Sequence, residues 1–162
     1  MNLHSSFVAI ILSVLVGCAP SVSPASSESQ RAVELQHSEV WSKGNLDLIP
    51  EIYAEDYVGH FPGGQTVTGR DEIRELVKSH RTSFPDWSEE ILESIVEGDR
   101  IVTRYRSRGT HRGEFLGYPP KGKKVHVEEA SVFHMVQGKI AEQWAFPDVV
   151  SLQNQISSAP DE

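Results

Sequence analysis

Two turn sequences divide the second half of the chain into strands. EGDR and QG each separate two segments rich in β-branched and aromatic residues, 87–96 from 101–110 and 125–136 from 139–146. Glycine and aspartate favour the tight turns that join antiparallel strands. With the Gly- and Pro-rich loop GEFLGYPPKGKK between the two pairs, the sequence predicts an antiparallel meander.

The first half of the chain has helical periodicity instead. Ile73, Leu76, Val77 and His80 follow the i, i+3, i+4, i+7 spacing of an amphipathic helix. We also expect helices at 31–41, 46–54 and 149–156 and a short strand at 56–61. Early helices and a late antiparallel meander predict an α+β fold, with the helices packed on one face of a curved sheet.

The composition limits the possible functions. The 162 residues suit about one domain, and the net charge of −8 argues against nucleic acid as the main partner. A single cysteine excludes an internal disulfide and a thiolate-rich metal site. Because no HExxH, GxGxxG or GxSxG sequence occurs, we expect neither a metal nor another cofactor.

The N-terminal region has the features of an export signal. Residues 7–16 are apolar but too few to span a bilayer, and Leu15-Val16-Gly17-Cys18 resembles the bacterial lipobox, whose cysteine is lipidated. The alternatives are an ordinary signal peptide or an N-terminal strand, since MNLHSSF contains no Lys or Arg.

These features define the expected domain limits. We expect a signal peptide at 1–17, a flexible Ser/Pro/Ala-rich tether at 18–29, a folded domain at 30–157 and a tail at 158–162. The mature protein would then be lipid-anchored through Cys18 in the bacterial cell envelope, on the extracytoplasmic side of a membrane.

Asp148 is the most informative candidate site residue, and two interpretations of it stay open. Strand alternation places Ile140, Trp144, Phe146 and Asp148 on one face, so the carboxylate would point into the core or a pocket unless Pro147 resets the alternation. Apolar neighbours there would raise its pKa towards the range of a catalytic acid/base. Alternatively, Asp148 is the N-cap of the helix that follows.

The strand before it predicts an interface. Ala130, Val132, Phe133, Met135 and Val136 put apolar groups on both faces of that strand. Because both faces would then have to be covered, we expect a homodimer formed through the sheet.

Four segments together resemble the SnoaL-like polyketide cyclase (ester cyclase) family of the nuclear-transport-factor-2-like superfamily. They are WSKGNLDLIPEIYAEDYVGH, TGRDEIRELVKSHRTSFPDW, EGDRIVTRYRSRGTHRGEFLGYPPKGKKV and QGKIAEQWAFPD. The resemblance implies a cone-shaped barrel of a curved, mixed, mostly antiparallel sheet packed against N-terminal helices. It also implies a deep apolar cavity, a common dimer, and an aspartate as acid/base at the mouth of the last long strand.

Position by position, the resemblance makes Asp148 the catalytic aspartate and turns His60 and His134 towards the cavity. Arg104 and Trp144 would line the cavity and bind substrate. SLQNQI at 151–156 departs from the family's Gly-Leu-Leu-x-Gln-Leu pattern, and a lipobox is unexpected for a cytosolic tailoring enzyme.

The resemblance implies cofactor-independent cyclisation by intramolecular aldol addition, or isomerisation, of a small apolar keto-ester. His60 and His134 would hold its ester or keto oxygens, and Arg104 would stabilise an enolate. The alternative is a non-catalytic envelope lipoprotein that binds a small hydrophobic ligand, with both histidines as hydrogen-bonded structural residues.

Overall fold

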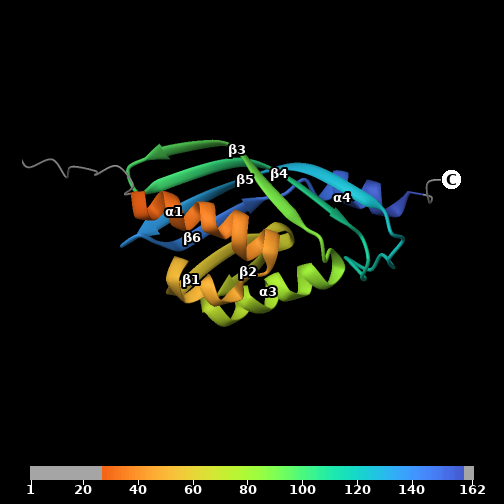
Figure 1. Ribbon diagram of the computed structural model, residues 1–162, viewed down its shortest axis with the longest axis horizontal. Coiled ribbons are helices and arrows are strands. Elements are labelled where there is room, and N and C mark those ends of the chain that lie inside the picture. The colour runs from red at the N-terminus through yellow and green to blue at the C-terminus, as the bar shows by residue number, and fades with distance from the viewer. Residues whose placement is uncertain (1–26, 159–162) are drawn as a thin grey trace, which may run out of the picture.

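The computed structural model describes residues 27–158, which form helices and one six-stranded sheet (Figure 1). In chain order the elements are α1 (Ser27–Leu35), the π-helix η1 (Gln36–Trp41), the 3-10 helix η2 (Leu46–Leu48), α2 (Ile49–Ile52), β1 (Tyr53–Phe61), the 3-10 turn η3 (Pro62–Gly64), β2 (Gln65–Thr68), α3 (Gly69–Ser83), β3 (Ser88–Glu97), β4 (Arg100–Thr110), β5 (Lys124–Val136), β6 (Lys139–Phe146) and α4 (Val149–Ser157).

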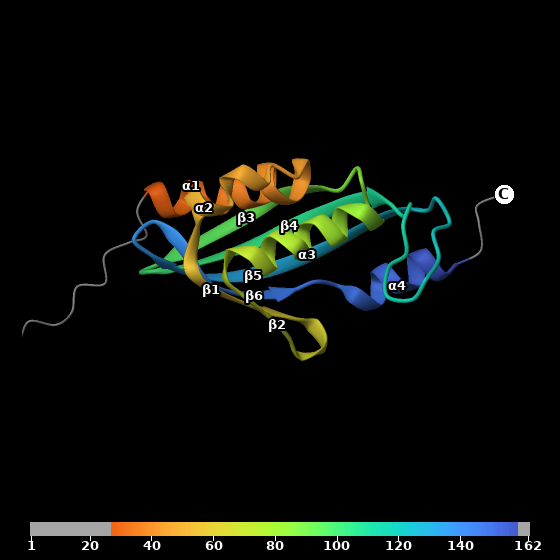
Figure 2. The same cartoon turned by 90° about the horizontal axis from the view of Figure 1, so that it is seen from below.

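The sheet is mixed and mostly antiparallel. Its strand order is β2-β1-β6-β5-β4-β3, and only the β1–β6 pair is parallel. Figure 2 shows α1, α2 and α3 on one face of this sheet. The α+β class and the meander β3–β6 are confirmed, whereas the cone shape stays a prediction.

Three elements differ from the sequence prediction. Residues 65–68 form strand β2, which pairs with β1 and was not predicted. The second helix ends at Ile52 rather than near residue 54, because Tyr53 already pairs with Ile140 of β6. Helix α1 begins at Ser27, inside the expected tether.

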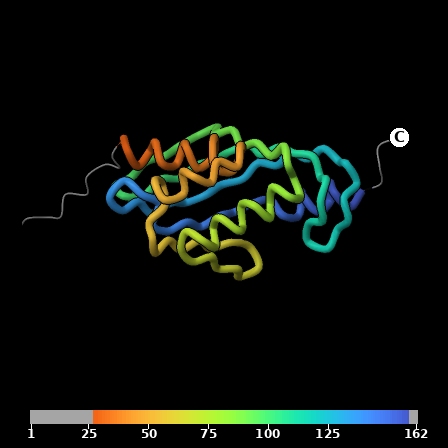
Figure 3. Tube along the Cα trace, turned by 60° about the horizontal axis from the view of Figure 1, so that its bottom comes forward, coloured from red at the N-terminus to blue at the C-terminus, as the bar shows by residue number. Residues whose placement is uncertain are grey.

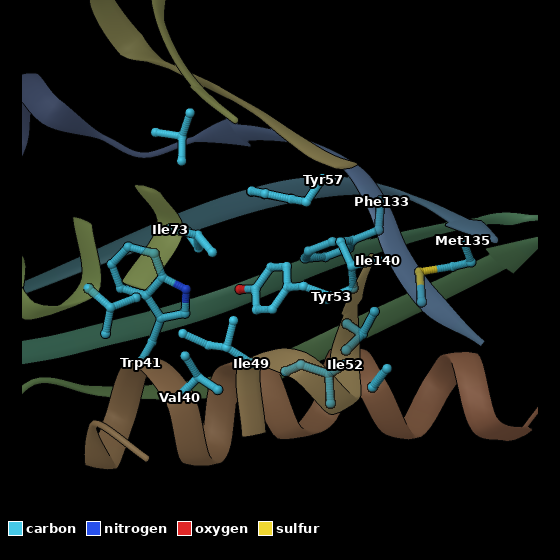
Figure 4. Close-up of a cluster of buried hydrophobic side chains, with 14 of the residues drawn as sticks. Val40, Trp41, Ile49, Ile52, Tyr53, Tyr57, Ile73, Phe133, Met135 and Ile140 are labelled. Carbon is cyan, nitrogen blue, oxygen red and sulfur yellow. The ribbon is translucent and has the colours of Figure 1, made fainter. Parts of the chain in front are cut away.

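The main core lies between the helices and the sheet. Figure 4 shows Ile49 and Ile52 of α2 and Ile73 of α3 facing Tyr53, Tyr57, Phe133 and Ile140 from the strands. A second cluster holds α4 against β5 through Leu152, Ile156, Val125 and Val127, joined by Phe84 and Trp87. The two clusters fix the two ends of the inner sheet face.

A β-bulge in β6 overturns the predicted alternation of that strand. His134 is paired with Glu142 but its neighbour Met135 with Ile140, so Ala141 is an extra residue that resets the phase. After the bulge Gln143 is buried, at 3% exposure, whereas Phe146 is 58% exposed. Trp144 and Phe146 therefore face away from the helices, and the prediction that Asp148 is buried against these two side chains is wrong.

The predicted signal peptide, Cys18 and most of the predicted tether lie outside the described residues. Between residues 27 and 158, no helix is long and apolar enough to cross a membrane.

Candidate functional site

A cavity of about 660 Å³ lies between the helices and the inner face of the sheet. Its walls include residues of η1, α3, the strands β4 to β6, the loop at 114–116 and the start of α4, together with residues from 61–65 at the turn between β1 and β2. The connection 111–123 between β4 and β5 lies beside α4 at one end of the molecule (Figure 3), and Lys121 Nζ donates there to the carbonyl oxygen of Ser157 at 2.6 Å. The volume is within the usual range for small-molecule sites, about 300–1,000 Å³.

Large aromatic side chains make up much of the cavity wall. Trp41, Phe61, Trp87, Tyr105 and Phe115 all line it. Flat rings of this kind favour contact with a flat, unsaturated ligand.

Glu129 is the most unusual polar group in the wall. It lies on the inner face of β5, and its Oε1 is buried without a hydrogen-bond partner among the described residues. Burial is the main cause that raises the pKa of Glu129 from its usual 4.5 to about 8, and the negative charges of Glu89 and, to a smaller extent, Asp148 also raise it. The nearby Ser107 hydroxyl acts in the opposite direction and lowers this pKa. At neutral pH this carboxyl is therefore mostly protonated and can act as a proton donor.

Asp148 lines the same cavity and is also an N-cap. Its Oδ1 accepts a hydrogen bond from the Ser151 amide at 2.9 Å, at the start of α4. The side chain is exposed rather than enclosed by apolar groups. The structure therefore combines the cap and the cavity position, which the sequence presented as alternatives.

His80 lies in an aromatic box on α3. Its ring centroid is 4.5 Å from that of Trp87, 5.2 Å from Phe84, 5.5 Å from Trp41 and 5.8 Å from Phe115. Burial, together with the charge of Arg81, lowers the pKa of His80 to about 4. Its Nε2 is buried without a hydrogen-bond partner among the described residues, so a neutral imidazole faces the cavity.

A hydrogen-bonded chain orients the polar groups between β1 and β4. Tyr57 Oη donates to Gln143 Oε1 at 3.1 Å, and Gln143 Nε2 donates to Ser131 Oγ at 3.3 Å. Tyr105 Oη lies 3.4 Å from the same Ser131 oxygen. Burial raises the pKa of both tyrosine hydroxyls, so they stay neutral and hold Gln143 at the cavity wall.

His37 and Glu89 form a buried pair next to Tyr105. His37 Nδ1 is 2.7 Å from Glu89 Oε2, and the His37 ring is 4.5 Å from the Tyr105 ring. Trp87 Nε1 donates to the other Glu89 oxygen at 3.0 Å. These contacts hold Glu89 where its charge acts on Glu129.

Four residues predicted for the cavity lie on the opposite face of the sheet. His60 Nε2 is 2.8 Å from Glu142 Oε1, and the His60 ring stacks on Trp144. His134 Nε2 is 3.2 Å from Asp99 Oδ2, and Arg104 pairs with Glu93 and Glu128. Of the five predicted cavity residues, only Asp148 lines it.

The physical reason is strand alternation. In β4 and β5 the odd-numbered residues are turned to the core, so Arg104 and His134 are turned outward. Glu129 belongs to the inward series with Val125, Val127, Ser131 and Phe133. A carboxylate in that otherwise apolar or small series was the signal that could have identified it from the sequence.

The described residues offer little for a metal ion. Between residues 27 and 158, no group of three or more His, Cys, Asp or Glu side chains comes together in a way that could hold one. The carboxyl and imidazole side chains that line the cavity are Glu114, Glu129, Asp148 and His80.

Known structures share this fold over most of the chain. A SnoaL-like polyketide cyclase candidate from Jannaschia sp. CCS1 is 27% identical, with a TM-score of 0.78, and covers 85% of this chain and 97% of its own. A polyketide cyclase candidate from Acidithiobacillus ferrooxidans is 26% identical, with a TM-score of 0.72, covering 83% and 98%. IdmH of Streptomyces antibioticus, described as a candidate polyketide cyclase, is 26% identical, with a TM-score of 0.71, covering 80% and 99%.

No curated protein sequence matches the chain. The family model of the SnoaL-like polyketide cyclases, by contrast, matches residues 31–156, which is nearly the whole described region. The chain therefore belongs to the SnoaL-like polyketide cyclase family.

Proposed function

We propose that the protein is a cofactor-independent acid/base enzyme of the ester cyclase type, which cyclises or isomerises a small keto-ester in its cavity. The observation that carries this proposal is Glu129, a carboxyl group that stays protonated at neutral pH and faces the cavity with an unpartnered oxygen. Carboxyl groups with a pKa near the working pH are well suited to general acid catalysis.

The two carboxyl groups take different roles in this proposal. The Asp148 carboxylate removes a proton from the carbon next to a substrate carbonyl, while Glu129 donates a hydrogen bond to the carbonyl oxygen as it becomes an enolate. The enolate carbon then forms a bond to a second carbonyl carbon of the same molecule. The new alkoxide takes the proton held by Asp148. The product is therefore an isomer of the substrate, and the Asp148 carboxylate is regenerated.

The related structures support this reaction class. Two of the proteins above at 26% identity are described as polyketide cyclase candidates. The aromatic walls suit a flat, unsaturated substrate of the kind that forms a stabilised enolate.

Hydrogen exchange tests the chemistry without the natural substrate. The methyl hydrogens of 2-acetonaphthone exchange with D₂O through an enolate, and NMR follows their loss. Wild type should accelerate this exchange, and Glu129→Gln should lower the acceleration about 10²-fold or more. Glu128→Gln is the matched control, because its side chain lies on the outer face with Arg104 and Arg106. Equal rates for the two variants would refute the role of Glu129.

The alternative is binding without catalysis. It is favoured by the use of the Asp148 carboxylate as a helix cap and by the aromatic cavity wall. If calorimetry detects binding of 2-acetonaphthone but NMR detects no accelerated exchange, the protein is a hydrophobic ligand carrier.

We also propose that two copies of the chain pair through the outer face of the sheet. A row of cross-strand neighbours there is apolar: Ile95, Val102, Val132 and Trp144. Ile95 is 57% exposed, which is unusual for so large an apolar side chain. Arg104 and Glu128 beside the row carry opposite charges, so the patch can complement a second copy of itself across a two-fold axis.

The lipid anchor at Cys18 is a further part of the proposal. Its support is the apolar run at 7–16 followed by Leu15-Val16-Gly17-Cys18. In a bacterial host, an alkyne-tagged palmitate should label the wild type and not Cys18→Ser, and only the wild type should fractionate with envelope membranes. Equal labelling of both proteins would exclude the anchor and, with it, the proposed extracytoplasmic location.

A further inference from the structure

Gln36 presents an unsatisfied hydrogen-bond acceptor to the cavity. The residue is only 1% exposed, yet its side-chain Oε1 has no hydrogen-bond partner among the described residues. The side chain lines the cavity. Buried polar atoms are paired in the great majority of cases, so an exception at a cavity wall calls for a partner that comes from outside the protein.

A π-helical turn directs this side chain. Gln36 begins the π-helix η1, in which the Ser42 amide donates to the carbonyl oxygen of His37, five residues earlier. In an α-helix, residues five apart point about 140° away from each other, but in a π-helix they are closer to one face. Gln36 and Trp41, five apart, both line the cavity.

The π-helical turn is held by specific contacts. Ser42 Oγ donates to the carbonyl oxygen of His37 at 2.6 Å and accepts from the Glu89 amide at 2.8 Å. The π-helix is therefore tied to the edge strand β3 rather than free to revert to an α-helix. Since π-helical turns are frequent at functional sites, this one is a second observation that points to Gln36.

Three polar groups with unpartnered atoms now surround one cavity: Gln36, His80 and Glu129. A protonated Glu129 offers a hydrogen to a carbonyl oxygen, whereas the Gln36 oxygen can only accept one. A ligand with a carbonyl group at one position and a hydroxyl group at another satisfies both.

We propose that Gln36 is a specificity-determining residue, whose carboxamide oxygen accepts a hydrogen bond from a ligand hydroxyl, so that the site takes hydroxylated aryl ketones. The inference rests on the proposed function for the placement of the ketone at Glu129. It narrows the substrate class from an apolar keto-ester to one with a free hydroxyl on its ring system.

A matched pair of probes tests the inference by calorimetry. 6-Hydroxy-2-acetonaphthone and 6-methoxy-2-acetonaphthone differ in one methyl group, which removes the hydroxyl donor. Wild type should bind the hydroxy compound about tenfold more tightly than the methoxy compound. Gln36→Met, which keeps the length of the side chain but removes the acceptor, should bring the ratio close to one.

The controls keep the test specific. Gln153→Met removes another carboxamide from the cavity wall and should leave the ratio unchanged. Gln36→Leu is the second apolar variant, and far-UV circular dichroism verifies the fold of each. A wild type that binds the two probes equally or binds neither, or a Gln36→Met variant that keeps the preference, would overturn the proposal.

This test is separate from the test of catalysis. A preserved probe preference without hydrogen exchange would refute the enzyme and leave the role of Gln36 intact. Accelerated exchange without any probe preference would refute the role of Gln36 alone.

Discussion

His60 and Trp144 stack on each other across the parallel pair β1–β6, with ring centroids 5.2 Å apart and planes 17° from parallel. Both belong to the face of the sheet that the helices leave uncovered, and Arg100 lies 5.4 Å above the Trp144 ring. Residues that resemble cavity groups in the sequence thus form part of an outer surface, and this surface yields the first prediction.

Trp144→Glu should convert a dimer into a monomer. The charge would lie at one end of the apolar row, next to Val132, where a second copy would desolvate it. Light scattering after gel filtration measures the mass. His126→Glu is the control, on the same outward face of β5 but outside the row. An unchanged mass for Trp144→Glu would exclude this interface.

The pH dependence of activity should report Glu129. As a general acid it works while protonated, so hydrogen exchange of 2-acetonaphthone should decline as the pH rises through about 8. Glu89→Gln removes a negative charge that raises the pKa of Glu129, and the decline should then begin at lower pH. A midpoint that stays in place or moves upward in Glu89→Gln would contradict this electrostatic coupling.

The same group should affect stability. The folded protein keeps its proton on Glu129 up to about pH 8, whereas the unfolded chain loses it near pH 4.5. Between these values the folded state binds more protons, so the free energy of unfolding falls with rising pH, by at most about 1.4 kcal/mol per pH unit. Urea denaturation at several pH values measures the free energy of unfolding. Relative to wild type, that of Glu129→Gln should increase as the pH rises from 4.5 to 8. A difference between the two proteins that does not change with pH would contradict a protonated Glu129 in the folded state.

His80 should produce the opposite slope on the acid side. It stays neutral in the folded state down to about pH 4, whereas the unfolded chain takes up a proton near pH 6.5. The unfolded state binds more protons in this window, so the free energy of unfolding falls as the pH falls from 6.5 to 4. His80→Phe should remove that loss.

Because Glu129 and His80 oppose each other between pH 4.5 and 6.5, the His80 measurement belongs in the Glu129→Gln background. His126→Phe, at an exposed position, is the control. Equal acid sensitivity of the His80 and His126 variants would mean that His80 is not held neutral.

Asp148 variants should separate capping from chemistry. Asp148→Ala removes the acceptor for the Ser151 amide and should lower the free energy of unfolding by about 1 kcal/mol, whereas Asp148→Asn keeps a capping oxygen and should cost little. Both should lose the accelerated hydrogen exchange, because neither has a carboxylate. Full exchange activity in a folded Asp148→Asn would leave Asp148 with the cap role alone.

The elements whose formation depends on residues close together in the sequence were predictable. Helix α3 follows from the spacing of Ile73, Leu76 and Val77, and the hairpin β3–β4 from Gly98 in a tight turn. Strand β2 escaped prediction because four residues, with only Val67 buried, carry too little pattern.

The site was predictable only in part. Asp148 stood out because a carboxylate follows Trp144, Phe146 and Pro147 in the chain, yet the Trp144 and Phe146 rings face the other way in the structure. Glu129 was missed because two adjacent glutamates resemble a solvated surface. The alternation of β5 in the sheet shows that Glu128 is outward and Glu129 inward.

The sequence by itself determined the α+β class, the order of most elements and the family, because periodicity, turn residues and motif spacing are local properties of the chain. Which side of each strand faces the cavity was decided by tertiary structure, since the bulge at Ala141 exists only in the pairing of β6 with β5. The proton on Glu129 was likewise decided by the fold, because its pKa depends on burial and on the charge of Glu89, forty residues earlier in the chain.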